Sequence, residues 1–140
     1  MASCVRRPYS IFGMNKYDPS ISPNPEKWLA LPEDERVELI RSFHEENAEN
    51  LSEEGQLELH AGIHAVVENQ IAMAYAPVSA TLAKLIRQGL SRHEAIHAIG
   101  TVLSGEIWQL QQQGQSKWDS GVYRRKLEKL TAKRWKKGQY

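Results

Sequence analysis

Four of the five histidines in the chain form two pairs with a spacing of four residues, His60 with His64 and His93 with His97. Residues four apart on a helix stand about 5–6 Å apart at their Cβ atoms, so both imidazoles of a pair can reach one metal ion. Bundle proteins build metal sites from side chains on facing helices in this way. The doubled spacing therefore predicts that the four imidazoles converge and that at least three of them bind a metal.

The alternative is that these histidines are ordinary core residues, each satisfied by its own hydrogen bonds. For one buried histidine this is the more common situation. Four neutral imidazoles in one core would leave several donors and acceptors to satisfy, and a metal would take one nitrogen from each. Metal binding is therefore favoured over a purely structural or partner-binding bundle, in which the histidines would be splayed apart or individually hydrogen-bonded.

Two glutamates accompany the histidine pairs. Glu68 follows His64 by four residues, and Glu94 lies inside the sequence His-Glu-Ala-Ile-His at residues 93–97. Either carboxylate can be a metal ligand, a partner that fixes an imidazole tautomer, or a base acting on bound water. Histidines alone favour zinc, with copper or nickel as alternatives, whereas carboxylate ligands make iron or manganese as suitable. The predicted cofactor is a divalent metal ion, with zinc favoured.

Residues 93–97 match the HExxH pattern with which zinc peptidases hold a metal and a general base on one helix. The next ligand of one such arrangement would fall on Leu103, which cannot bind a metal. Glu106 lies too close on the same helix to fold back as a ligand. No strand edge is predicted to hold an extended peptide. The pattern therefore does not predict a peptidase, and His60 or His64 would supply the further ligand.

Glu94 also has a structural role available to it. Ser91 and Glu94 have the S-x-x-E spacing of a capping box, in which each side chain binds the other residue's backbone amide. We favour this role over that of a catalytic base. Whether the metal is structural or catalytic, and so whether the chain is an enzyme, stays open.

Helical periodicity runs through most of the chain. Pro25 and Pro32 stand where helices begin, and Gly89 fits the left-handed residue that ends one. Further helices are expected over residues 52–76, 77–88, 92–113 and 116–135. No strand alternation of useful length is present. The sequence predicts an all-α fold, a compact bundle of four to five helices, with the four tryptophans packed in the core or between helices.

The first 24 residues contain three prolines and show neither helical nor strand periodicity. We therefore expect an extended arm over residues 1–24 and a single helical domain over residues 25–140. In the helix after Pro32, His44 falls at helical spacing with the apolar residues Val37, Ile40 and Phe43. It is expected to face inward or to border the core, and it is a possible additional ligand.

The composition limits the compartment. The single cysteine, Cys4, excludes a disulfide framework, and a reducing, cytoplasmic location is expected. No apolar run approaches the roughly 18 residues that span a bilayer, and the first residues lack the apolar region of a signal peptide. The chain is expected to be soluble and to have no membrane partner, whereas a protein partner or self-association is possible.

The charges are unevenly distributed although they nearly cancel, with a formal net charge of +1. Residues 33–58 carry ten acidic side chains, and residues 124–137 carry eight basic ones. We interpret these segments as two solvated helix faces that attract each other. A nucleic-acid-binding module that uses the basic last helix, with Trp135 and Tyr140 available for stacking, is the less favoured alternative.

Residues 59–108 carry three motifs in a recognisable order, "LHAGIHAVVENQ", "LAKLIRQGL" and "RHEAIHAIGTVLSGEIW". In this order they resemble a family of short bacterial proteins of unknown function. The resemblance implies a compact helical domain with HxxxH, a nearby Glu and Gln, and HEAxH. It implies no activity, and the arm before Pro25 has no counterpart in it.

Overall fold

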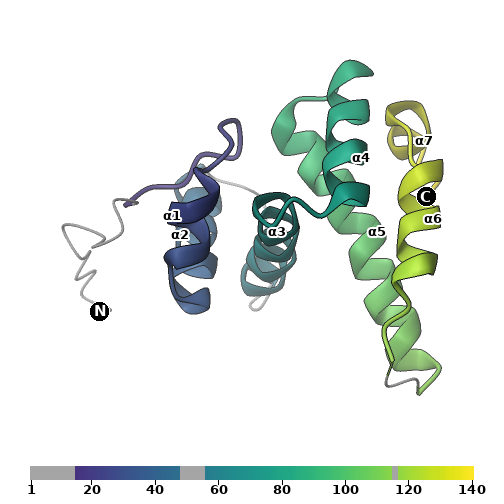
Figure 1. Ribbon diagram of the computed structural model, residues 1–140, viewed down its shortest axis with the longest axis horizontal. Helices are drawn as coiled ribbons and strands as arrows, with labels where there is room; N and C mark the ends of the chain where they lie inside the picture. The colour runs from purple at the N-terminus through teal and green to yellow at the C-terminus, as the bar shows by residue number, and fades with distance from the viewer. Residues whose placement is uncertain (1–14, 48–55, 115–116) are drawn as a thin grey trace.

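The computed structural model describes residues 15–47, 56–114 and 117–140. In these residues the chain is helical without strands, which confirms the expected all-α bundle (Figure 1). The helices are α1 (Pro25–Ala30), α2 (Glu33–Glu46), α3 (Gln56–Ala72), α4 (Ala76–Arg87), α5 (Arg92–Gln112), α6 (Ser120–Lys129) and α7 (Ala132–Lys136).

Helix α3 occupies the middle of the molecule. The pair α1 and α2 lies on one side of it, α4 and α5 lie on the other, and α6 and α7 cover the far side of α4 and α5 (Figure 1). Buried side chains of α3 join both resulting cores, Ala61 and Ala65 with Trp28 and Ile40, and Val67 with the apolar residues of α4 to α6. Helix α3 is therefore the element through which any site shared by α2 and α5 must be built.

Three of the expected helix boundaries are confirmed by their capping geometry. Asn24 accepts a hydrogen bond from the Lys27 amide ahead of Pro25, the first residue of α1. Ser91 caps α5. Gly89 ends α4 with a φ of 101°, which the absence of a Cβ atom allows.

The third predicted helix ends earlier than expected. It was expected to reach Pro77, but α3 ends at Ala72 and Ala74 adopts a left-handed φ of 56°. The Tyr75 amide then donates to the Gln70 carbonyl, which closes the helix end. A proline ring clashes with the carbonyl four residues earlier, so the helix could not have continued through Pro77.

The last predicted helix, residues 116–135, is two helices. Asp119 accepts hydrogen bonds from the amides of the first turn, so α6 begins at Ser120. Leu130 is extended and buried, and the Thr131 hydroxyl caps the Arg134 amide to begin α7. Arg134 is consequently exposed, whereas one continuous helix would have placed it beside Leu127.

Two further expectations about the surface are correct only in part. Trp108 and Trp118 are exposed, whereas Trp28 is fully buried and Trp135 is half-buried. The acidic helix α2 and the basic helices α6 and α7 lie on opposite sides of the molecule, so they do not attract each other across a contact (Figure 1). Among the described helices, none is long and apolar enough to cross a membrane.

Candidate metal centre

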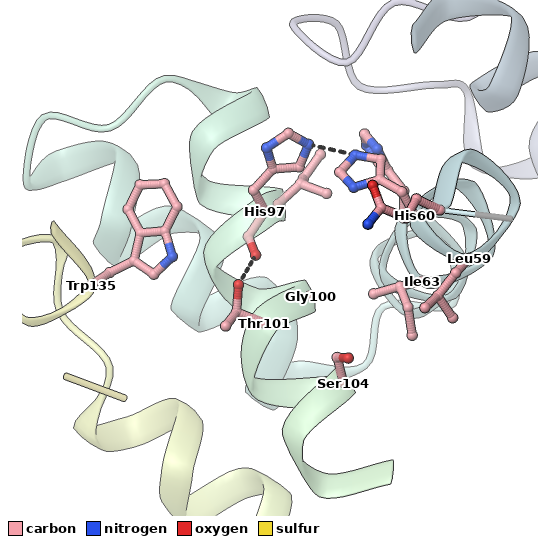
Figure 2. A pocket seen from close by; sticks show the side chains of 11 residues that line it. Leu59, His60, Ile63, His97, Gly100, Thr101, Ser104 and Trp135 are labelled. Carbon is pink, nitrogen blue, oxygen red and sulfur yellow. Dashed lines mark hydrogen bonds between the residues drawn. The ribbon is translucent and has the colours of Figure 1, made fainter. Parts of the chain in front are cut away.

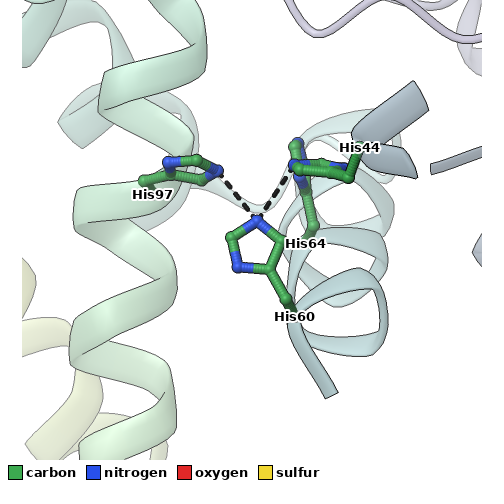
Figure 3. A group of neighbouring side chains, drawn as sticks. All are labelled: His44, His60, His64 and His97. Carbon is green, nitrogen blue, oxygen red and sulfur yellow. Dashed lines mark hydrogen bonds between the residues drawn. The ribbon is translucent and has the colours of Figure 1, made fainter. Parts of the chain in front are cut away.

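All five histidines of the chain gather in one place. His44 comes from α2, His60 and His64 from α3, and His93 and His97 from α5. Neighbouring imidazoles have their ring centroids between 4.2 and 6.0 Å apart. His44, His60, His64 and His97 each offer a ring nitrogen within 4.8 Å of the others (Figure 3). We call the five residues the histidine cluster.

The Nε2 atoms of the cluster approach one another closely. The Nε2 of His60 lies 2.9 Å from that of His44 and 3.0 Å from that of His97 (Figure 3). The Nε2 of His93 lies 3.3 Å from that of His44. Zinc–nitrogen bonds of about 2.0–2.1 Å in a tetrahedron separate neighbouring nitrogens by about 3.3–3.4 Å. The observed spacing is therefore close to that of nitrogens around one metal ion.

Hydrogen bonds between neutral imidazoles do not account for both short Nε2–Nε2 distances of His60. The Nδ1–H of His44 donates to the Ile40 carbonyl at 2.8 Å, so in neutral His44 the Nε2 carries a lone pair. If His60 donates its Nε2–H to His44, the same nitrogen has no lone pair for His97. If it does not donate, the lone pairs of His44 and His60 face each other. A cation among these nitrogens would remove the conflict, because it accepts every lone pair.

His64 is held from outside the cluster by Tyr17, which comes from the segment before α1. The Tyr17 hydroxyl lies 2.8 Å from His64 Nε2 and donates a hydrogen bond to Glu68. Its only proton is thus committed to the carboxylate, so His64 Nε2–H donates to the Tyr17 oxygen. The other nitrogen, His64 Nδ1, is buried and has no hydrogen-bond partner among the described residues. It therefore presents a lone pair that no described residue satisfies.

Glu68 is buried and belongs to an ion pair. Its side chain is 1% exposed, and both carboxylate oxygens accept from the Arg92 guanidinium at 2.8 Å. Arg92 also donates to the Pro19 carbonyl at 2.9 Å, which ties the segment before α1 to the start of α5. Tyr17, Glu68 and Arg92 thus form a fixed support behind His64, which we call the tyrosine support.

The surroundings favour neutral imidazoles. Burial, followed by the neighbouring histidines, lowers the pKa of His64 well below its ordinary value. The same causes lower the pKa of His97 to about 3. Burial and the Glu68 carboxylate raise the pKa of Tyr17. His64 and His97 therefore present uncharged nitrogen donors, the form that binds a metal.

Glu94 occupies the capping box that its spacing predicts. The Ser91 amide donates to the Glu94 carboxylate at 3.0 Å, and the Glu94 amide donates to the Ser91 hydroxyl at 3.1 Å. Glu94 is exposed, and its hydrogen bonds with Ser91 lower its pKa. The capping role of Glu94 is confirmed, and its carboxylate is engaged at the helix start.

A cavity of about 500 Å³ opens beside the cluster. His60, His64 and His97 form one part of its wall, and residues of α3, α5 and α7 form the rest (Figure 2). A Cβ atom on Gly100 would lie 3.1 Å from Ile63 Cγ2, so the glycine allows α3 and α5 to approach closely here. One side of the cluster thus faces a cavity, and His44, which is fully buried, does not line it.

The predicted site residues fall into three groups. The structure brings together His60, His64, His93 and His97, and it adds His44 at their centre. It places Glu68 behind His64 and Glu94 at the helix start. Sequence reasoning missed Tyr17 and Arg92. Arg92 stands next to His93 in the first turn of α5, but no local spacing connects Tyr17 with residues about fifty positions away.

Comparison with known proteins gives a family and no function. No curated protein and no solved structure matches the chain significantly. One family model matches residues 23–129, a range that contains the whole histidine cluster and leaves out Tyr17. Because this match covers most of the chain, the protein belongs to the family described as a domain of unknown function, DUF1841.

Proposed function

We propose that the protein binds one divalent transition-metal ion in the histidine cluster. The observation that carries this proposal is the group of four ring nitrogens, from His44, His60, His64 and His97, within 4.8 Å of one another. In the proposed site His44, His60 and His97 bind through Nε2, and His64 binds through Nδ1. His93 lies against His44 and completes the nitrogen-rich surroundings.

The tyrosine support orients His64 in this proposal. A metal-binding histidine usually donates its other ring N–H to a carboxylate, a backbone carbonyl or a water, which fixes the tautomer and the ring orientation. The Ile40 carbonyl has this role for His44 and the Tyr17 hydroxyl has it for His64. Glu68 acts through Tyr17, because both of its oxygens are engaged by Arg92 and Tyr17.

The donor set favours zinc. Four imidazole nitrogens in a tetrahedral arrangement suit zinc, with copper and nickel as alternatives. Iron or manganese would be favoured by oxygen ligands, and the buried carboxylate nearest the cluster is committed to Arg92. The ion would tie α2, α3 and α5 together between the two cores, and it would face the cavity on one side.

Metal titration tests the proposal. Metal-free, untagged protein should take up one zinc ion per chain in competition with a chromophoric chelator. His60→Ala should abolish this uptake, because His60 Nε2 contacts the Nε2 atoms of both His44 and His97. Tyr123→Phe is a suitable control, since this buried aromatic bonds Gln70 away from the cluster. The proposal fails if the wild type takes up no zinc, or if His60→Ala binds it as tightly.

A further inference from the structure

The cavity beside the histidine cluster has walls that differ in character. His60, His64 and His97 line it where it meets the cluster. Away from them the walls are largely apolar, with Leu59 and Ile63 on α3 and Trp135 on α7 (Figure 2). Ile96 on α5 also lines the cavity. None of the described lining residues is an aspartate, glutamate, lysine or arginine. The cavity thus meets the histidine cluster at one end and offers apolar contact at the other.

The size of the cavity suits a small molecule. Ligand pockets are usually apolar spaces of about 300–1,000 Å³ with a few polar groups that fix the ligand's orientation. This cavity, at about 500 Å³, is within that range. The Thr101 hydroxyl does not offer a free donor, because it donates to the His97 carbonyl at 2.9 Å. Gln56 and Ser104 are the other polar lining residues, and the histidines are the lining residues that can bind a metal.

We infer that the cavity binds a small uncharged molecule with an apolar aromatic or aliphatic body and a single metal-binding head. The inference rests on the proposed metal site. The body lies between Ile63, Ile96 and Trp135, and the head reaches the ion on the side where His60, His64 and His97 line the cavity. Because the four histidines already fill a tetrahedral site, the head would have to bind as a fifth ligand, a coordination number that zinc sites reach in some catalytic transition states.

The discriminating probe is a pair of ligands with the same head. Cobalt(II) replaces zinc, because its visible absorption reports the coordination of the ion. Imidazole has the metal-binding head alone, and a phenyl-substituted imidazole adds an apolar body. Burying the ring should lower the half-saturating concentration of the phenyl compound about 10–150-fold relative to imidazole, since an aromatic side chain of that size gains about 1.5–3 kcal/mol on burial.

A substitution at the cavity wall provides the specific test. Ser104 is exposed and lines the cavity, so Ser104→Phe should fill part of it without disturbing the core. The advantage of the phenyl compound over imidazole should then fall by at least about tenfold, whereas imidazole binding should not change. Gln109→Phe, on an exposed part of α5 that does not line the cavity, should keep the advantage.

The outcomes separate the two proposals. If the protein takes up no cobalt, the metal site fails and the ligand inference fails with it. If cobalt binds but the phenyl compound binds no more tightly than imidazole, the metal site stands and the cavity inference is overturned. Equal effects of Ser104→Phe and Gln109→Phe would also overturn it. Metal content measured after each titration excludes loss of cobalt as the cause of a spectral change.

Discussion

Tyr17 determines which nitrogen of His64 faces the cluster. Because its proton is committed to Glu68, the phenol oxygen can only accept from His64 Nε2, which leaves the Nδ1 lone pair toward the other histidines. This explains how a residue that binds no metal would shape the site. The buried ion pair of Glu68 with Arg92 holds the carboxylate that takes the phenol proton, and it stands behind His64.

Removing the Tyr17 hydroxyl should therefore weaken metal binding without unfolding the protein. We expect Tyr17→Phe to lower zinc affinity about 10–100-fold, the usual effect of losing a partner of a metal-binding histidine. The ring itself still packs on Trp28 and Phe43. Competition with a chromophoric chelator measures the affinity. Tyr123→Phe also removes a buried phenol hydroxyl but should leave the affinity unchanged, and equal effects of the two variants would contradict the account.

We expect Glu94 to contribute to the stability of α5 and not to metal binding. Glu94→Gln should retain the metal and lose little stability, since glutamine also fills the last position of a capping box. Ser91→Ala should lower the free energy of unfolding by about 0.5–2 kcal/mol, because the Glu94 amide loses its acceptor. Urea denaturation and elemental analysis measure the two effects. Loss of the metal in Glu94→Gln would show that the carboxylate acts at the site.

At this scale the sequence predicted the pairs but not the whole cluster. His60 and His64 are four residues apart, as are His93 and His97, so each pair was expected to lie on one face of a helix. The meeting of the two pairs was expected because both faces were assigned to the core side. His44 could be placed only near the core, because its partners lie on other helices. Tyr17 could not be found, since its place depends on the path of the segment before α1 and not on any periodic pattern.

Helix ends were the least predictable elements. Periodicity shows that a helix exists, but it does not show where capping groups stop it. Asp119 and Thr131 split a stretch that reads as one amphipathic helix, because both side chains accept backbone N–H bonds that begin a new helix. Pro77 correctly indicated an interruption after α3. The left-handed residue that closes α3 is an alanine, so it lacked the usual glycine signal.

The end of α3 allows a test of this element. A left-handed conformation costs an L-residue roughly 1–2 kcal/mol, so Ala74→Gly should raise the free energy of unfolding by up to about 1 kcal/mol. Ala80→Gly is the matched control, because Ala80 is exposed within α4. It should be destabilised by about 0.5–1 kcal/mol. Urea denaturation measures both, and the same sign for both variants would contradict the assigned conformation.

At the scale of the whole molecule, the buried histidines should make the free energy of unfolding of the metal-free protein depend on pH. Burial and the neighbouring histidines lower the pKa of His97 to about 3, whereas an unfolded histidine titrates near its ordinary value of 6.5. Below pH 6.5 the unfolded chain therefore binds protons that the folded chain does not. The free energy of unfolding should be highest above that pH and should fall continuously toward pH 3.

Urea denaturation of metal-free protein at several pH values measures this dependence. His97→Asn should show a smaller decrease between pH 6.5 and 3, because it removes one of the groups whose pKa differs between the folded and unfolded states. If the stability of the wild type did not change over this range, or rose, the histidines would not be buried as neutral groups.

Among the described helices, α3 contributes buried side chains to both cores, and an ion bound by α2, α3 and α5 would tie the two cores together further. Because a metal that binds only the folded chain contributes its binding energy to folding, chelation should lower the melting temperature substantially. Differential scanning calorimetry with and without chelator measures the change, and His64→Ala should melt like the chelated wild type. An unchanged melting curve after verified metal removal would contradict this structural contribution.

Elemental analysis of untagged protein, purified without a metal-affinity step, tests the central claim most directly. The account predicts one first-row transition metal ion per chain, with zinc as the metal, and its loss in the double variant His60→Ala and His97→Ala. A wild-type protein free of such metals after growth in zinc-supplemented medium would contradict it. The same metal content in the double variant would contradict it equally, because the ion would then bind elsewhere.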